Sequence, residues 1–187
     1  MILPIIAYGD PVLKTRASDI EPGHPGLAAL IENMWDTMYN AKGVGLAAPQ
    51  IGLSLRLFLV DASPFADEYP NLAGFKRAFI NPAILKEWGD EWLFNEGCLS
   101  FPDFREDIYR KPKLILSFQD EQFNRHEEEF SGIAARIIQH EYDHIEGIVM
   151  TDRISPLRRT LNRKKLLNIS KGNVKPEYLM RFPARKR

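Results

Sequence analysis

The stretch that most constrains this chain runs from Ser131 to Gly147, with the sequence SGIAARIIQHEYDHIEG. Serine is typical of a helix N-cap and glycine of the residue just past a helix end, so the apolar spacing between them predicts one helix of about four turns. Residues three and four apart are neighbours on a helix surface. One stripe of this helix then carries five side chains: Ile133, Ile137, His140, Glu141 and His144.

The two histidines of this stripe are spaced one helical turn apart, in the order H-E-x-x-H. Such a pair can bind one divalent metal ion, and the intervening glutamate can reach a water molecule on it, which is the arrangement of metal-dependent hydrolases. The alternative is that His140 and His144 only line the core. The pentapeptide favours the metal site.

A catalytic metal usually has three protein ligands and a water, so the histidines leave one ligand to be found. The candidate is Cys98, which follows Gly97 in the segment NEGCLSFP just after a predicted strand. A lone cysteine is more often a small buried apolar residue, but here a strand end, a glycine and a missing ligand coincide. A third ligand from Asp or Glu stays open, whereas a thiolate would suit iron as well as zinc.

The length of 187 residues suits a single catalytic domain over 1–187 that buries a core without disulfides. The one cysteine cannot form an internal disulfide, which favours a reducing compartment. The first residues, MILPIIAYGD, carry no basic leader, and Pro4 interrupts their apolar run. No stretch approaches about 18 consecutive apolar residues. We therefore expect a cytoplasmic protein without a membrane partner.

Basic residues are concentrated near the end of the chain. Residues 153–187 contain twelve Lys and Arg and one acid, Glu177, a local charge of +11 within a chain of net charge zero. Such a basic helix and tail on an acidic body indicates contact with a polyanion, such as the RNA of the ribosome. A solvated helix face with a frayed end is the alternative.

The remaining pattern predicts an N-terminal helix over about 25–41, strands in the middle, and a C-terminal helix over about 156–170. The segment GVGLAAPQIG reads as a loop, and 62–75 as a surface excursion. Three leucines of the C-terminal helix are expected to hold it to the body: Leu157, Leu161, and either Leu166 or Leu167. The candidate strands are Leu55–Asp61, Ala78–Asn81, Glu87–Phe94, Lys113–Asp120 and His126–Phe130. An α+β fold follows, with antiparallel sheets wrapped around the central metal-binding helix.

Three segments of the chain, in their order and spacing, resemble the three signature motifs of peptide deformylase. They are GVGLAAPQ at 43–50, EGCLS at 96–100 and HEYDH at 140–144. The resemblance implies removal of the formyl group from the N-terminal formylmethionine of newly made peptides, with release of formate. It also implies ferrous iron as the metal in the cell, with zinc or nickel able to take its place.

The residue chemistry fits that reaction. Cys98, His140 and His144 would hold the ion and leave one position open, where a dication lowers the pKa of a bound water from about 15.7 to about 7. Glu141 would take the proton of the water and pass it to the leaving amine. The side-chain amide of Gln50 and the backbone N–H of Leu99 would donate to the oxyanion of the tetrahedral intermediate.

Substrate contacts are expected beside the three motifs. The resemblance implies that the Gly45 segment pairs with an extended peptide like an added strand, and that Arg105 contacts the substrate. Gly97 belongs to the same turn as Cys98. A methionine side chain needs apolar walls, for which the candidates are Val44, Phe94, Ile133 and Ile137.

Two further expectations concern charged residues near the metal helix. Arg136 precedes His140 by one turn, where many relatives are apolar, and we expect its head group to reach the surface; if it points inward, these pocket walls are wrong in part. Asp143 and Arg110 are expected to pair and stiffen the helix, a hypothesis that a separation well beyond about 4 Å would remove.

Two other functions fit parts of this pattern. The first is a peptidase built on the same helix, which gains no support from the Cys98 turn. The second is a metal-stabilised protein that binds the ribosome or RNA, but a structural site needs a fourth protein ligand, and the remaining histidines, His24 and His126, lie in segments expected to be exposed. For ribosome contact, we expect that deletion of 153–187 weakens salt-sensitive association and leaves activity on short peptides intact.

Overall fold

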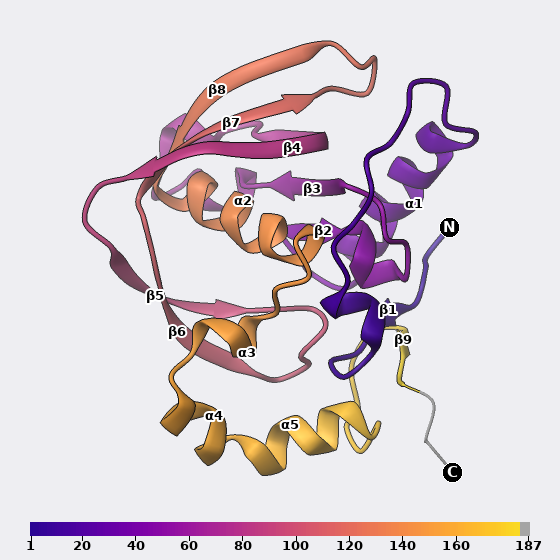
Figure 1. The fold of residues 1–187 in the computed structure, drawn as a ribbon, viewed down its shortest axis with the longest axis vertical. Helices are drawn as coiled ribbons and strands as arrows, with labels where there is room; N and C mark the ends of the chain where they lie inside the picture. Colours follow the sequence, from indigo (N-terminus) through magenta and orange to yellow (C-terminus); the bar gives the residue numbers. More distant parts are fainter. Residues whose placement is uncertain (184–187) are drawn as a thin grey trace.

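The computed structural model describes residues 1–183. Three of the basic residues of the predicted tail, Arg185, Lys186 and Arg187, lie outside the described residues. Helix α2 (Gly132–Ile145) is at the centre, between a five-stranded sheet and the β5–β6 hairpin (Figure 1). The predicted α+β fold with sheets around this helix is confirmed.

The large sheet is antiparallel throughout, in the order β2-β3-β4-β7-β8. Its strands are β2 (Gly45–Ala47), β3 (Leu57–Asp61), β4 (Lys76–Trp88), β7 (Lys113–Gln119) and β8 (Arg125–Ser131). Every residue of β3 is buried because this strand is covered on both faces. One face packs a cluster of phenylalanines against α2, and the other packs against α1 (Leu27–Asn40), which buries Ile31, Met34 and Met38.

Two smaller sheets complete the fold. Strands β5 (Trp92–Gly97) and β6 (Arg105–Arg110) form an antiparallel hairpin, and β1 (Ile5–Ile6) pairs in parallel with β9 (Met180–Arg181). The C-terminal half adds α3 (Met150–Arg153), α4 (Pro156–Leu161) and α5 (Arg163–Ser170), which pack under the hairpin (Figure 1). None of the helices formed by residues 1–183 combines the length and apolar character needed to cross a bilayer.

The ends of α2 match the expected signals only in part. Ser131 occupies the N-cap position but its side chain makes no capping hydrogen bond. Gly147 follows the helix with a φ of 72°, and a Cβ at this position would lie 2.8 Å from the backbone oxygen of Lys14. Glycine is therefore required there for both backbone conformation and space.

Several predicted boundaries are wrong. The strand expected over Glu87–Phe94 is the end of β4 and the start of β5, because Gly89 adopts a φ of 92° and turns the chain between them. The predicted loop GVGLAAPQIG contains β2 and the 3-10 helix η2 (Ala48–Ile51). The sequence pattern predicts neither strand β6 nor helix α3. The physical reason for the missed β6 is that its inward positions include charged residues.

The predicted helix over 156–170 is two helices that meet at Asn162. The side chain of Asn162 donates to the buried carboxylate of Glu106 on β6, which ties this bend to the body. Leu157 and Leu161 are 69% and 68% exposed, and Leu167 is also exposed, so the expected anchoring by these residues is wrong. Leu166 is buried as predicted, together with Ile169.

Candidate metal centre and active site

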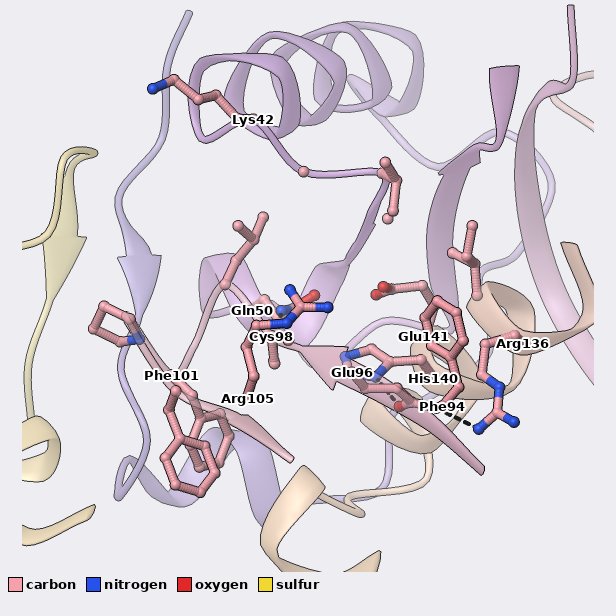
Figure 2. Close-up of a pocket in the computed structure, with 18 of the residues that line it drawn as sticks. Lys42, Gln50, Phe94, Glu96, Cys98, Phe101, Arg105, Arg136, His140 and Glu141 are labelled. Atoms are coloured by element: carbon pink, nitrogen blue, oxygen red, sulfur yellow. Dashed lines mark hydrogen bonds and ion pairs between the residues drawn. The ribbon is translucent and has the colours of Figure 1, made fainter. Parts of the chain in front are cut away.

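The structure brings one sulfur and two imidazoles together. Cys98 lies in the turn after β5, whereas His140 and His144 project from α2, and one ligand atom from each of these residues lies within 4.8 Å of the others. The Cys98 Sγ is 3.3 Å from the His144 Nε2. Figure 2 shows His140 and Glu141 on the side of the pocket formed by α2. One thiol and two imidazoles are a donor set that suits a divalent transition metal.

The surroundings of the two histidines affect metal binding differently. Burial opposes a charge on His140, but its hydrogen bonds with Cys98 and Glu96 outweigh burial and raise its pKa well above the usual value, so a metal must displace a proton from this ring. The Nδ1 of His140 is 2.8 Å from Glu96 Oε2, so a proton on Nδ1 leaves Nε2 free to act as a ligand. Burial, together with the neighbouring His140, lowers the pKa of His144 well below its usual value. Metal ligation requires neutral imidazole, which this shift favours. The residues present therefore fit a divalent cation.

Glu141 is buried beside this cluster, at 4% exposure. Its Oε2 atom has no hydrogen-bond partner among residues 1–183, and burial raises the pKa of the carboxyl to about 7. A cation bound next to it would act in the opposite direction and favour the carboxylate. An unpartnered carboxylate oxygen facing a cavity is a group available for proton transfer.

Gly45 explains how Glu141 fits against β2. A Cβ atom at Gly45 would lie 2.3 Å from Glu141 Oε1, closer than two such atoms can approach. The carboxylate therefore occupies the space that any other residue at position 45 would fill. The sequence reasoning assigned Gly45 only to close approach of a substrate, and the structure gives it this second reason.

Gln50 is held with its amide group turned toward the Cys98 turn. Its Oε1 accepts a hydrogen bond from the backbone N–H of Ala47 at 2.7 Å. Its Nε2 is thereby directed toward Cys98 Sγ at 3.6 Å and Ser100 Oγ at 3.5 Å. Gln50 is 1% exposed, so its amide N–H groups form a fixed donor beside the three candidate ligands.

A cavity of about 480 Å³ joins these groups. Every predicted site residue except His144, which is buried, lines this cavity, part of whose lining is drawn in Figure 2. The lining thus includes Val44, Gly45, Gln50, Phe94, Gly97, Cys98, Leu99, Arg105, Ile133, Ile137, His140 and Glu141. Sequence reasoning missed Phe65 and Tyr178, which come from separate segments that carry no local signal of a site.

The expected position of Arg136 is wrong. Its side chain is 2% exposed and its guanidinium lies 4.4 Å from the centre of the Trp92 ring, with Nη1 donating to Glu96 Oε1 at 2.9 Å. A buried carboxylate and two backbone carbonyls satisfy this charge, so it does not reach for solvent. Because Arg136 also lines the cavity, the predicted apolar pocket is wrong in part.

Glu96 connects this charge to the candidate ligands, a role that sequence reasoning missed although the residue precedes Cys98 by two. It accepts hydrogen bonds from Arg110 at 2.7 and 3.0 Å, from Arg136, and from His140. Burial opposes ionisation, but the bonds from His140 and Arg110 outweigh it and hold the pKa of Glu96 well below its usual value. Arg110 also forms an ion pair with Asp143 at 2.8 Å, as the sequence analysis predicts.

Arg105 lies along the β5–β6 hairpin. It donates to the side-chain oxygen of Asn95 at 2.9 Å and also to the Asn95 backbone oxygen. A Cβ at Gly97 would be 2.6 Å from the Arg105 Nη1, so the glycine makes room for the guanidinium. The hairpin thus fixes a positive charge at the wall of the cavity (Figure 2).

Comparisons with known proteins agree on one family. A model of the polypeptide deformylase family matches residues 2–160. Peptide deformylases of Christiangramia forsetii and Flavobacterium johnsoniae are 56% and 55% identical, each over 100% of this chain and 99% of the relative. The crystal structure of a peptide deformylase from Legionella pneumophila superposes with a TM-score of 0.81 at 37% identity, covering 94% of this chain and 100% of that one. The crystal structure of a peptide deformylase from Thermotoga maritima superposes with a TM-score of 0.75 at 40% identity, covering 83% of this chain and 99% of that one. By sequence and by fold, the chain belongs to the polypeptide deformylase family.

Proposed function

We propose that residues 1–187 act as one catalytic domain in which Cys98, His140 and His144 hold a single ferrous ion. As a member of its family the chain is a deformylase, an enzyme that removes N-terminal formyl groups from nascent peptides. The observation that carries the proposed site is the meeting of one sulfur and two imidazoles in a cavity that also contains an unpartnered buried carboxylate oxygen. A divalent cation held there would supply Lewis acidity and would lower the pKa of water to about 7.

The residues of the chain then carry out the proton transfers. Glu141 Oε2, which has no other partner among residues 1–183, accepts a proton from the attacking water and returns it to the nitrogen of the leaving amine. Gln50 Nε2 and the Leu99 backbone N–H donate to the formyl oxygen as it gains negative charge. The Gln50 amide is fixed by its hydrogen bonds and Leu99 lies in a tight turn, so these two donors need little reorganisation during the reaction.

The remaining cavity residues would bind the peptide. Val44, Phe94, Ile133 and Ile137 present apolar surface to the methionine side chain, with the buried Arg136 behind Phe94. Gly45 lies on β2, the edge strand of the large sheet, where an extended peptide can add as a further strand. Gly97 and the fixed Arg105 guanidinium would contact the peptide beyond its first residue.

The decisive experiment is anaerobic purification with metal analysis, followed by a formate assay on a formyl-methionyl peptide and on its acetyl analogue. We expect about one divalent metal per chain, formate from the formyl peptide, and far slower hydrolysis of the acetyl peptide. Iron is the expected metal, and zinc or nickel would also fit the donor set. A metal-loaded protein that releases no formate would overturn the proposal.

A ferrous ion bound by a thiolate also favours one kind of cellular compartment for the protein. Such a site is sensitive to oxidation at the cysteine sulfur. Cys98 is the one cysteine of the chain, so no disulfide competes with this role. A reducing compartment protects it, and we propose the cytoplasm, where nascent peptides are made.

Gly45→Ala tests the fit of Glu141 against β2. The added methyl must displace the carboxylate, and a misplacement of about 1 Å can cost on the order of 100-fold in rate. We expect kcat to fall by about 10- to 100-fold with the metal content unchanged, measured by formate release and metal analysis. The control is Gly74→Ala, where a Cβ meets nothing within 4 Å; its φ of 72° should cost this variant some stability, but its activity should persist. Wild-type activity in Gly45→Ala would show that the carboxylate tolerates the methyl.

We also propose that the basic C-terminal region contacts ribosomal RNA near the point where nascent chains emerge. Part of its charge is used inside the protein, because Arg153 pairs with Asp143 and Arg158 with Glu106. The exposed basic residues available for such contact include Arg163, Lys164, Lys171 and Lys175.

These internal pairs change the test of that proposal. Deletion of 153–187 would also remove the partners of Asp143 and Glu106, so activity on short peptides need not survive it. Replacing Arg163, Lys164, Lys171 and Lys175 by alanine is the sharper variant. We expect weaker cosedimentation with ribosomes and a shallower dependence on salt, because each phosphate contact contributes about −0.7 to −0.9 to the slope. Binding and slope equal to wild type would exclude these residues as the contact.

A further inference from the structure

The segment after α5 returns to the active site. Residues 173–183 lie beyond the part of the chain that matches the family model, which ends at residue 160. Strand β9 pairs with β1, with Ile5 opposite Met180, and the Ile5 N–H donates to the Leu179 carbonyl at 2.9 Å. Figure 1 shows the two strands side by side, below α1. The two ends of the chain thus form one ribbon next to the cavity.

This ribbon supplies a residue to the cavity wall. Tyr178, two residues before β9, lines the cavity, and its hydroxyl donates to the Leu99 carbonyl at 2.7 Å. The next carbonyl along the chain, that of Ser100, accepts from the Tyr8 backbone N–H at 2.9 Å. Two consecutive carbonyls of the turn after Cys98 are therefore held by residues that flank β1 and β9 in the sequence.

Leu99, in the same turn, lines the cavity. Leu99 is the residue whose N–H is assigned to the oxyanion, and this N–H donates to none of residues 1–183. The Leu99 side chain is restricted as well, since a Cβ at Gly43 would lie 2.7 Å from its Cδ1. The Leu99 N–H shares a peptide plane with the Cys98 carbonyl, which accepts from the Phe101 N–H at 2.8 Å. Tyr178 holds the next peptide plane through the Leu99 carbonyl, so both planes that meet at the Leu99 Cα are fixed and the free N–H has a defined direction.

We propose that Tyr178 is a positioning residue for deformylation: its hydrogen bond to the Leu99 carbonyl, together with the bond from Phe101 to the Cys98 carbonyl, keeps the Leu99 N–H directed toward the formyl oxygen. The inference rests on the proposed function, because it needs Leu99 as an oxyanion donor. Tyr178 does not touch the reacting atoms. It makes the C-terminal return segment, which lies beyond the residues that match the family model, part of the active site.

Tyr178→Phe tests the proposal because it removes the hydroxyl and keeps the ring in the wall. Orientation of an oxyanion donor matters in the transition state and not for ground-state binding, so kcat should fall while KM stays the same. We expect a decrease of about three- to tenfold in kcat, the size of effect expected for one orienting hydrogen bond. Steady-state formate release at full metal loading is the measurement.

Two control variants separate positioning from folding. Tyr109→Phe removes a hydroxyl from a tyrosine that is 60% exposed on β6, and should leave kcat unchanged. Glu177→Ala removes the exposed ion pair with Lys42, 3.0 Å long, from the same segment but keeps the Tyr178 hydroxyl, and should also leave kcat unchanged. A decrease in kcat confined to Tyr178→Phe supports the proposal.

Three results would overturn it. The first is a wild-type kcat in Tyr178→Phe. The second is a lower kcat that follows a matching loss of metal, because the bond would then act on the metal centre. The third is an equal loss of kcat in Glu177→Ala, because the segment as a whole would then be responsible. Failure of the proposed function is distinguishable from all three, since wild-type protein would itself release no formate.

Discussion

Replacing Glu141 by alanine is expected to abolish deformylation while the metal stays bound. The carboxylate is not one of the three grouped ligands, so the variant should purify with a normal metal content. It is, however, the buried group that can shuttle a proton between water and amine, a role worth about 10²- to 10⁴-fold in rate. Formate release measured beside metal content checks both halves of this expectation.

Stability measurements make the result easier to interpret. The Glu141 carboxyl is buried, and its Oε2 lacks a partner among residues 1–183, which costs stability in the folded protein. Its removal should therefore leave the melting temperature unchanged or raise it. Glu141→Gln is the companion variant, because it keeps the shape that fits against Gly45 and loses only the basicity. Turnover retained in either variant would refute the assignment of Glu141 as the proton carrier.

Replacing Cys98 by alanine is expected to remove the metal. Changing an outer-shell partner of a ligand already costs about 10- to 100-fold in metal affinity, so loss of a ligand itself should cost more. The variant should emerge from gel filtration with little metal and no measurable turnover. Its melting temperature should fall toward that of the chelator-treated wild type, because a metal that binds only the folded state stabilises it.

The controls for this experiment use the same residue and a distant histidine. Cys98→Ser keeps the size of the side chain and replaces the soft sulfur by oxygen, so it should bind metal more weakly than wild type. His126→Ala removes a histidine that pairs with Asp120 at the β7–β8 turn and should keep the full metal content. A fully loaded Cys98→Ala protein would exclude the thiolate as a ligand.

Most of the site could be predicted because the metal ligands and the catalytic glutamate lie in two short sequence segments. His140, Glu141 and His144 lie within two turns of one helix, and Cys98 is part of a turn whose glycine and position after a strand are visible in the sequence. The central helix, the N-terminal helix and most strands of the large sheet follow from local periodicity. These features need no knowledge of distant contacts.

The errors arose where a distant partner decides the outcome. Arg136 was expected at the surface because an arginine usually needs water, but Glu96, 40 residues away, satisfies it inside. Strand β6 was missed because Glu106 and Arg110 look like exposed residues, although each is buried against a charged partner. The contact of Tyr178 with Leu99 spans 79 residues and leaves no mark in either local sequence.

The contact between Gly45 and Glu141 has a consequence for inhibition. A compound that lies along β2 touches backbone at a position where the enzyme cannot introduce a side chain without displacing its own proton carrier. A larger residue at Gly45 would block such a compound, but it would also reduce the deformylase activity of the enzyme. Resistance should therefore arise first at another residue of the cavity wall, such as Phe65.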